Sequence, residues 1–341
     1  GLLKRVKNAN SPTVFWEAVS TDAFGHYQLE NFGNGVQTFT DFDQASGLMQ
    51  SREGGLGGGT GLIHSQVDWD LNGNLKQRID HKVGAGMTED FYYDNLNRFD
   101  YSRRNGGQNF DVALDAIGNL TSRQVNADPV QGYDYTNPQT GCSYYSHAQP
   151  RAVRKVGTTV YCYDPNGNMT KRAGSTISYT SYNLPAVIDA PGNYSSSLSY
   201  GAFRNRYKQV AIGPQGTETT IYVAGLVEKV TRGSSIEYRH LIHGGQGTAA
   251  IYARRSSGIH DTYYLHRDHL GSPELITGGD GDVLIRPSFA AYGERRDGSD
   301  WDGPPSSADL NTLAGITRRG FTGHEHLDAV NLIHMNGRVY E

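Results

Sequence analysis

The sequence predicts an all-β protein built from repeated β-hairpins. One observation is a short motif that recurs along the chain: an aromatic or apolar run, Asp, two or three variable residues, Gly or Asn, and a second apolar run. The other is composition, since Gly accounts for 43 of 341 residues and Tyr for 22. A Gly content of about 7% is usual. Many turns and many amphipathic rings favour an antiparallel sheet with one face in water.

Each copy of the motif predicts one hairpin. The Asp side chain accepts a hydrogen bond from a backbone N–H two residues on, and Gly or Asn adopts the positive φ that closes the turn. Most steps between copies are 21 to 27 residues, enough for two strands of about seven residues and their turns. Thr180 and Gly201 replace the Asp in two degenerate copies. An ordinary sandwich is the alternative, but recurrence favours a stacked array. The predicted turn residues are Asp22, Asp43, Asp70, Gly73, Asp94, Asp115, Gly118, Asp164 and Gly167.

The sequence pattern divides the chain into two regions. The hairpin motif recurs over residues 1–212, and it is replaced by a different pattern over residues 213–341. An insertion at about 126–150 is rich in Asn, Pro, Tyr and Gln, and we expect it to project as a loop or to cover an inner surface. Residues 54–59 are nearly all Gly and predict a flexible or tightly turning insertion. No Lys-Ser or Lys-Thr follows them, so they are not a phosphate-binding loop. Later strands are expected at 219–223, 227–230, 236–242, 249–253, 262–265 and 332–335.

A short helix is predicted to begin within residues 304–313, with Ser306 or Ser307 as its N-cap.

Net charge is −4 with the two signs interspersed, which argues against nucleic-acid binding through this segment. The sequence contains no run of 18 apolar residues, so it predicts no membrane-spanning helix. Cys142 and Cys162 are the two cysteines, and their pairing stays open.

Four distal stretches resemble a known family: residues 263–272, 290–295, 319–325 and 332–340. In this order they look like the Rhs repeat-associated core domain, and the hairpin motif resembles the YD repeats of bacterial Rhs proteins, of the Tc toxin C component and of teneurins. The resemblance implies that YD hairpins spiral into a hollow shell, a β-cocoon, which the core plugs with a short helical element. The core signature residues are His266, Asp268, His269, Gly271, Gly323, His324 and Glu325.

The resemblance also implies a function. The chain is expected to be a structural shell segment of a bacterial Rhs polymorphic toxin, a secretion effector that encapsulates and helps deliver a C-terminal toxin domain absent from this chain. That toxin domain is the expected partner, with a delivery-system protein and an immunity protein as further candidates. Synthesis in the bacterial cytoplasm would precede secretion or delivery to a target cell or surface. The alternative is a cell-surface adhesion or recognition shell that binds a protein or glycan.

No enzymatic activity is expected. Relatives self-cleave through an aspartate pair downstream of the tract that matches residues 338–340, and that pair is absent here. Arg338 matches an arginine implicated in the cleavage, so it is a candidate contributor to a downstream site. An autoprotease is therefore the least favoured interpretation.

Two other groups of residues are candidate sites. His266 with His269, and His324 with His326, have the spacing of metal ligands, with His240, His243 and His334 nearby. No Cys or carboxylate set at zinc spacing completes a site, so neither a metal nor another cofactor is expected. A glycosidase needs two facing carboxylates, and the candidates were Asp268, Glu274, Asp280 and Asp282. Residues 278–282 more simply predict a hairpin turn than a calcium loop, and no Gly-x-Ser-x-Gly motif is present.

Overall fold

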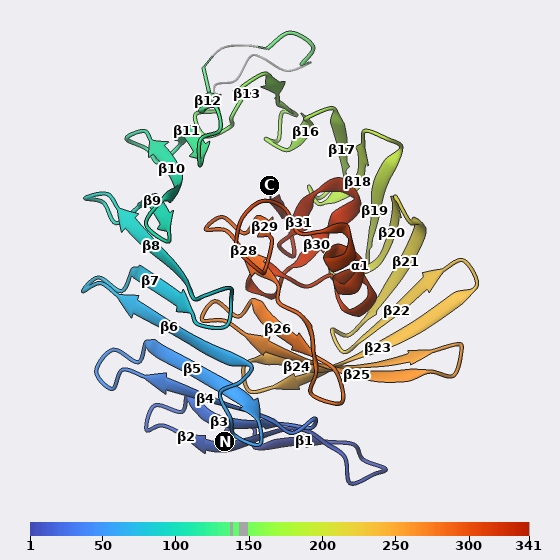
Figure 1. Cartoon of the computed structure of the whole chain (residues 1–341). Helices are drawn as coiled ribbons and strands as arrows, with labels where there is room; N and C mark the ends of the chain where they lie inside the picture. The colour runs from blue at the N-terminus through green and yellow to red at the C-terminus, as the bar shows by residue number, and fades with distance from the viewer. Residues whose placement is uncertain (137–138, 143–148, 341) are drawn as a thin grey trace. The chain divides into compact units, whose positions relative to one another are not determined.

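The chain is an all-β protein, as predicted, in a computed structural model that describes residues 1–136, 139–142 and 149–340. Its strands follow one another in sequence order as hydrogen-bonded neighbours (Figure 1). One sheet runs from β1 to β14 and a second from β15 to β27, and two short sheets pair β28 with β29 and join β30 to β32. A sheet of this order is a continuous antiparallel meander, which is what successive hairpins produce.

The strands of the first sheet are β1 (Arg5–Lys7), β2 (Val14–Thr21), β3 (Tyr27–Phe32), β4 (Val36–Phe42), β5 (Met49–Leu56), β6 (Ile63–Trp69), β7 (Leu75–Asp80), β8 (Met87–Tyr93), β9 (Phe99–Arg104), β10 (Gln108–Leu114), β11 (Leu120–Val125), β12 (Gln131–Asp134), β13 (Lys155–Val156) and β14 (Thr159–Val160). The second sheet contains β15 (Cys162–Tyr163), β16 (Met169–Arg172), β17 (Ser175–Tyr179), β18 (Pro185–Ala190), β19 (Tyr194–Tyr200), β20 (Arg206–Gly213), β21 (Gly216–Val223), β22 (Val227–Arg232), β23 (Ser235–Gly244), β24 (Gly247–Arg255), β25 (His260–Arg267), β26 (Pro273–Thr277) and β27 (Val283–Ile285). The remaining elements are β28 (Ser288–Phe289), β29 (Arg295–Arg296), helix α1 (Ser307–Ile316), the 3₁₀ turns η1 (Phe321–Gly323) and η2 (Asp328–Val330), and β30 (Glu325–Leu327), β31 (Leu332–His334) and β32 (Val339–Tyr340).

The predicted helix and the strands beyond residue 219 are confirmed. Ser306 is the N-cap of α1, and its hydroxyl accepts a hydrogen bond from Asp309 N at 3.1 Å. Within the described ranges, no helix has the length and apolar character needed to cross a membrane.

The chain forms two compact units, which we describe separately. Unit 1 comprises Gly1–Thr88 and Thr220–His326, and unit 2 comprises Glu89–Thr219 and the chain from Leu327 onward. The division into residues 1–212 and 213–341 concerns repeat texture rather than compactness, and it stays a prediction.

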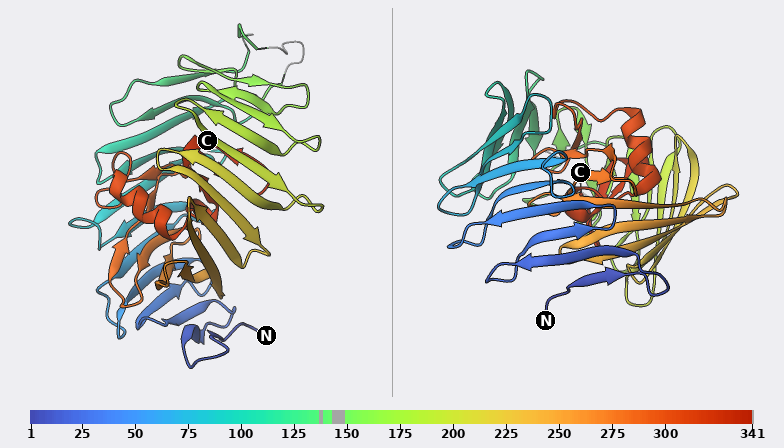
Figure 2. Two further views of the ribbon diagram at one scale, coloured as in Figure 1. Left: turned by 90° about the vertical axis from the view of Figure 1, so that its right-hand side faces the viewer. Right: turned by 60° about the horizontal axis from the view of Figure 1, so that its bottom comes forward.

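Unit 1 has three apolar clusters, of which the smallest is formed by Val83, Met87 and Trp301. Strands β2 to β6 lie side by side as long ribbons (Figure 2), and a first cluster packs around the fully buried Trp16, whose indole N–H donates to Glu30 Oε1 at 2.7 Å. Tyr27, Phe32 and Ala250 belong to this cluster. The second cluster joins the sheet to α1 through Leu241, Ile251, Leu265, Ile276, Ile285, Leu313 and Ile316.

Unit 2 is held by an apolar cluster, an aromatic row and a disulfide. Ile177 and Ile188 of the sheet pack against the segment around η2, which contributes Leu327, Val330 and Leu332. Along β8 to β10, the ring of Phe99 lies 6.4 Å from that of Phe91 and 5.9 Å from that of Phe110. Such offset aromatic contacts add to simple area burial.

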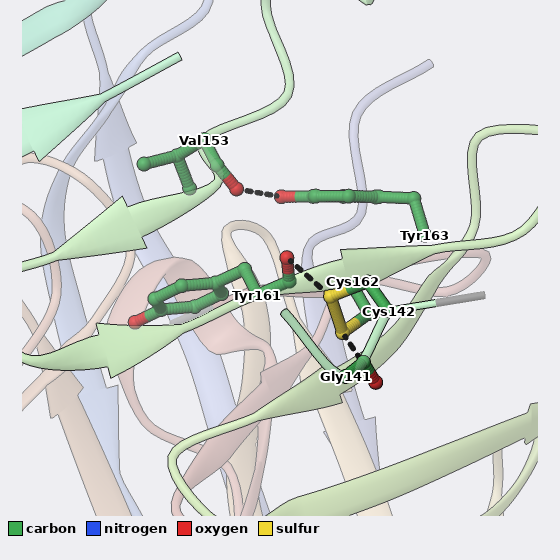
Figure 3. Close-up of a disulfide and its surroundings, with 6 residues drawn as sticks. All are labelled: Gly141, Cys142, Val153, Tyr161, Cys162 and Tyr163. Atoms are coloured by element: carbon green, nitrogen blue, oxygen red, sulfur yellow. Dashed lines mark hydrogen bonds between the residues drawn. A yellow bond between two sulfur atoms is a disulfide. The ribbon is translucent and has the colours of Figure 1, made fainter. Parts of the chain in front are cut away.

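The disulfide of unit 2 joins Cys142 to Cys162 (Figure 3). Their sulfurs lie 3.6 Å from the carbonyl oxygen of Tyr161 and 3.9 Å from that of Gly141, respectively. Both cysteines are buried. The sequence left this pairing open, and the bond ties the chain before β13 to strand β15.

The repeat turns share one hydrogen-bond pattern. At Asp70, the backbone N–H donates to Asn74 O at 2.9 Å, and the carbonyl accepts from Gly73 N at 3.0 Å. The Asp70 carboxylate accepts from Asn72 N and Asn74 N, both at 2.9 Å, while Gly73 has φ +80°. These are the carboxylate contact and the positive φ that the sequence predicts. The same backbone pattern occurs at Asp22, Asp94, Asp115, Asp164, Thr180 and Gly201, and the turn at Asp43 is one residue longer.

The structure refines two predicted insertions. At 54–59 it contains the tight turn that the sequence predicts as one alternative, since Gly59 N donates to Leu56 O at 3.1 Å and Gly57 and Gly58 have φ of +59° and +85°. Gly54 and Gly55 instead belong to β5, where neighbouring atoms come too close for a side chain. A Cβ on Gly54 would lie 2.7 Å from Gln37 O, and one on Gly55 would lie 2.4 Å from Gly59 O. The expected loop at 126–150 contains strand β12, which pairs with β11 and so satisfies backbone groups of that edge. Residues 137–138 and 143–148 of this insertion lie outside the described residues.

Candidate functional site

The core signature of unit 1 contains the same turn as the repeats. Asp268 N donates to Ser272 O at 2.8 Å, Gly271 N donates to Asp268 O at 3.0 Å, and Gly271 has φ +81°. The Asp268 carboxylate accepts from Leu270 N and Ser272 N at 2.9 and 2.8 Å. The sequence analysis assigned Asp268 and Gly271 to a separate signature and did not predict that they form the same turn as the repeats. Their Asp-x-x-Gly spacing, which the repeat turns share, was a signal for it.

Two signature segments distant in sequence are joined at this turn. Thr322 N donates to Ser272 Oγ at 3.0 Å, and a turn from Gly320 to His324 is closed by a bond from Gly320 N to His324 O at 2.7 Å. Gly323 has φ +74°, and a Cβ there would lie 3.4 Å from Arg267 Nη1. The structure thus brings Asp268 and Gly271 together with Gly323 and His324.

Arg267 fastens this junction to the sheet. Its guanidinium donates to Gly271 O at 2.5 Å and to Thr248 O at 3.1 and 3.2 Å. Burial, with the charges of Arg319 and Arg52, lowers the pKa of Arg267 to about 10, so the group stays cationic at neutral pH. Its hydrogen bonds to backbone carbonyls are therefore charge-assisted.

The signature histidines of β25 and its turn are neutral at pH 7, and His266 is buried whereas His269 is half-buried. His266 is 0% exposed, its Nε2 lies 3.1 Å from Thr277 Oγ1, and its ring meets that of Phe32 edge-on at 4.5 Å. Burial, followed by the charges of Arg52 and Arg286, lowers the pKa of His266 to about 3. Burial likewise lowers the pKa of His269 to about 4. These rings act as packed core groups.

The second signature segment forms another buried polar cluster. Glu325 accepts a hydrogen bond from Tyr222 Oη at 2.5 Å, and His324 Nδ1 lies 2.7 Å from Thr322 Oγ1. The pKa of Glu228 is raised by burial and then by the charge of Glu325, although Arg319 binds Glu228 at 3.1 Å. His326, whose pKa burial lowers to about 2, accepts from Phe321 N at 3.2 Å. No group of three or more His, Cys, Asp and Glu in the described ranges is arranged to hold a metal ion.

A small pocket of about 50 Å³ with a mixed polar and apolar lining borders the Asp268 turn. Asp80, Asp268, His269 and Glu274 are among the residues that line it. Burial raises the pKa of Glu274 to about 8, with Arg52 opposing and Asp268 and Asp80 reinforcing the shift. Arg52 Nη1 lies 3.6 Å from Glu274 Oε1. The sequence named Asp268 and Glu274 but gave no signal for Arg52 or Asp80, which only the fold brings close.

The other carboxylate candidates lie in a simple turn. Gly278 N donates to Asp282 O at 2.9 Å, and Gly281 N donates to Gly278 O at 3.1 Å. Asp280 Oδ1 accepts from Asp282 N at 3.1 Å. Residues 278–282 therefore form the hairpin turn that the sequence favours, and neither carboxylate lines the pocket beside Glu274.

A buried ion-pair network, which sequence reasoning missed, holds helix α1 on the sheet of unit 1. Glu237 accepts from Arg239 Nε at 2.5 Å and from Arg255 Nε at 2.7 Å. Arg239, which is 1% exposed, also donates to Ala314 O at 2.9 Å and to Gly315 O at 3.2 Å. Cations at the carbonyls of a helix C-terminus complement the helix dipole.

Arg338 lies in unit 2, in the tight turn before β32, and is exposed. Its carbonyl accepts a hydrogen bond from Met335 N at 2.9 Å. Its suggested role in a downstream self-cleavage site stays a prediction.

No protein-family model and no curated protein matches the chain. Among solved structures, it is similar to the Tc holotoxin pore of Photorhabdus luminescens, at 12% identity and a TM-score of 0.47, over 97% of this chain and 20% of that chain. It is also similar to the TcdB2–TccC3 complex, at 14% identity and a TM-score of 0.44 with the same coverage. The structural neighbours are thus Tc toxin chains, of which this chain spans about a fifth of the length. At these scores the likeness assigns neither an activity nor a partner.

Proposed function

We propose that this chain is a wall segment of a bacterial toxin shell that encloses a passenger domain and helps deliver it. The observation that carries the proposal is the uninterrupted order of the hairpins, from β1 to β14 and from β15 to β27. In such a meander each inner strand pairs on both sides, so that unpaired backbone groups remain at the outer edges. Successive hairpins of this kind suit a segment of a wall.

The core signature supports a structural role in the same way. Arg267, Ser272 and Thr322 are engaged with backbone or with each other, and burial keeps His266 neutral, as partial burial does His269. These contacts lock two segments together, which suits a plug that closes the shell. We propose that the chain itself has no enzymatic activity and binds no cofactor.

The proposed partners follow from this role: the enclosed toxin domain first, then a delivery-system protein and an immunity protein. The Cys142–Cys162 disulfide supports a working location outside the reducing bacterial cytoplasm, because disulfides persist in oxidising compartments. We therefore propose synthesis in the cytoplasm followed by secretion or delivery.

A surface that recognises a protein or glycan is the second candidate, and an exposed patch in unit 2 favours it. The rings of Tyr92 and Tyr101 stack at 4.2 Å, and the guanidinium of Arg103 lies 5.3 Å from the Tyr101 ring. Tyr92 is 39% exposed. Tyr and Arg are enriched at recognition surfaces. In this case the hairpins would bind a partner on their outer surface rather than enclose a passenger domain.

Limited proteolysis of the full-length gene product tests the proposed enclosure. The passenger domain is expected to be cleaved at least tenfold more slowly in the full-length protein than when it is produced alone. Equal cleavage rates would contradict enclosure. In the same experiment, the 341-residue chain incubated without protease should stay intact, and an Arg338→Ala variant should behave identically. Specific self-cleavage of the chain would overturn the non-enzymatic part of the proposal.

A further inference from the structure

We propose that the Cys142–Cys162 disulfide is a redox-sensitive fastening within unit 2, and that its reduction opens the place where the two large sheets meet. That place is residues 153–172, which we call the sheet junction. It contains β13 and β14 at the end of the first sheet and β15 and β16 at the start of the second. The opening itself does not depend on the shell function. Only its purpose, the release of a passenger, rests on that proposed function.

The sheet junction has less backbone pairing than the neighbouring part of unit 2. Strands β13, β14 and β15 have two residues each and β16 has four, whereas β19 and β20 have seven and eight. Among the residues that the structure describes, the first sheet ends at β14 and the second begins at β15, and no ladder of hydrogen bonds joins these two strands. Short strands with few ladder bonds open locally at a lower free energy than long inner strands.

The disulfide crosses the sheet junction (Figure 3). Cys162 is the first residue of β15, and Cys142 lies in the chain before β13, so the bond joins the end of the first sheet to the first strand of the second. Beside it, Tyr163 Oη donates to Val153 O at 2.9 Å. A hydrogen bond of this kind breaks and re-forms in local fluctuations, whereas the covalent bond does not. The disulfide therefore determines whether the sheet junction stays closed.

The reductant reaches the sulfurs through a local opening. Cys142 and Cys162 are 8% and 5% exposed, and the short strands beside them open without unfolding of the whole unit. The thiolate of a dithiol reductant then attacks one sulfur, the bond between the two cysteines breaks, and the other sulfur leaves as a thiolate. The second thiol of the reductant displaces the first cysteine from the mixed disulfide. The reductant ends as a disulfide, and the two cysteines gain two electrons and two protons as thiols.

The two sides of a delivery step hold this bond in opposite states. Disulfides persist outside cells and are reduced in a cytoplasm that contains thiol reductants. The sheet junction is therefore closed before delivery and opens after entry into a reducing cytoplasm. In a shell wall, this gives the passenger an exit at one defined position.

Hydrogen–deuterium exchange of the whole 341-residue chain, with and without dithiothreitol, tests the opening. Amides of residues 153–172 should accelerate on reduction by about tenfold or more relative to any acceleration in β19 and β20, because the disulfide restrains the sheet junction directly. Equal exchange in the two redox states would overturn the proposal. Equal acceleration of the sheet junction and of β19 and β20 would also overturn it, since the disulfide would then stabilise unit 2 as a whole.

Two variants show that the disulfide is the controlling link. The double variant Cys142→Ser with Cys162→Ser should exchange at the fast rate with or without dithiothreitol, and the reduced wild type decides the question if this variant does not fold. Tyr163→Phe is the matched control, because it removes the hydrogen bond to Val153 and keeps the disulfide. Oxidised Tyr163→Phe should keep its sheet junction protected, and exchange as fast as in the reduced wild type would contradict control by the disulfide.

Passenger release is measured separately, in the full-length gene product, with a protease that itself contains no disulfide. Faster cleavage of the passenger after reduction supports release through the sheet junction. Cleavage that is equally slow in both redox states would overturn release while enclosure holds. Cleavage that is as fast in both states as that of the isolated passenger would overturn enclosure itself. The exchange experiment on the 341-residue chain decides the opening in either case.

Discussion

The two units are built from the same hairpin turn but have different interiors. In unit 1 the buried side chains of Glu, Arg and His are Glu30, Arg52, Glu228, Glu237, Arg239, His266, Arg296, Glu325 and His326. Among the described residues of unit 2, the corresponding set is Glu89, Arg172 and His334. Unit 2 instead has the apolar cluster around Ile188 and the Cys142–Cys162 disulfide.

The shared turn determines the backbone conformation of both units, whereas the buried side chains determine which conditions affect the stability of each unit. A buried charge is costly unless it is paired and hydrogen-bonded, so unit 1 depends on ion pairs and on pH. A disulfide acts mainly on the unfolded chain, so unit 2 depends on redox conditions.

The three tryptophans of the chain, Trp16, Trp69 and Trp301, all belong to unit 1. Tryptophan fluorescence therefore reports on unit 1, whereas far-UV circular dichroism reports on the strands of both units.

The largest effect is expected from Arg239→Met. It leaves the carboxylate of Glu237 with fewer partners and removes the hydrogen bonds to Ala314 and Gly315. Breaking one side of a buried pair costs roughly 3–5 kcal/mol. Urea unfolding followed by tryptophan fluorescence measures the loss. Arg254→Met, at an exposed position of unit 1, is the control and should change stability by less than about 0.5 kcal/mol. A loss below about 1 kcal/mol for Arg239→Met would show that the network does not stabilise unit 1.

The next effect concerns unit 2. Replacing both cysteines, Cys142→Ser with Cys162→Ser, should cost roughly 2–4 kcal/mol. The loss should appear in the circular dichroism transition and leave the tryptophan transition unchanged. Reduction of the wild-type protein with dithiothreitol should reproduce the shift, and the double variant should not respond to it. A shift of the tryptophan transition alone would reverse the proposed contrast between the units.

A matched pair of glycine substitutions tests whether the turn is the same in both units. Gly167 in unit 2 and Gly271 in unit 1 have φ of +85° and +81°. Gly167→Val and Gly271→Val should each destabilise their unit by roughly 1–3 kcal/mol, because a β-branched residue is strained there. Gly107→Val is the control, since nothing surrounds a Cβ at Gly107 and its φ is not positive. No effect at Gly167 or Gly271 would remove the common-turn assignment.

A pH-dependent effect is expected from Glu274→Gln. The folded pKa of Glu274 is about 8, whereas an unfolded Glu has a pKa of about 4.3. The folded state therefore holds the proton more tightly, and this contribution to stability is lost as pH rises from about 4.5 to about 8. The variant lacks this loss. Its free energy of unfolding, followed by tryptophan fluorescence, should therefore increase relative to that of the wild type as the pH rises from 5 to 8. A constant difference across this range would contradict the assignment.

His266 and His269 act in the opposite direction. Their folded pKa values of about 3 and 4 lie below the unfolded value of about 6.5, so their contribution is lost as pH falls below about 6.5. The wild-type tryptophan transition should therefore weaken on the acid side even in the Glu274→Gln background.

Features set by neighbours in sequence could be predicted. The Asp70 turn is local, because its carboxylate bonds the backbone within four residues, and the N-cap Ser306 of α1 is equally local. The core signature could be recognised as a set of residues. That Asp268 forms the same turn as the hairpin repeats was not predicted, because the repeat motif and the core signature were treated as separate patterns.

Features set by the fold could not be predicted. Arg52 meets Glu274, and Arg239 meets Ala314, only after strands distant in sequence have paired, so their spacing carries no signal. The pairing of Cys142 with Cys162 depends likewise on how the chain runs between β12 and β15. Gly54 appeared to be a flexible position, whereas its lack of a side chain serves a close approach to Gln37.

A cryo-EM map of the full-length gene product tests the central claim most directly. If this chain is a wall segment, the map will show its hairpins bounding a cavity that contains density for the passenger, folded, disordered or cleaved. A solvent-open interior without passenger density, with a partner bound on the outer face of the hairpins, would contradict enclosure and support recognition.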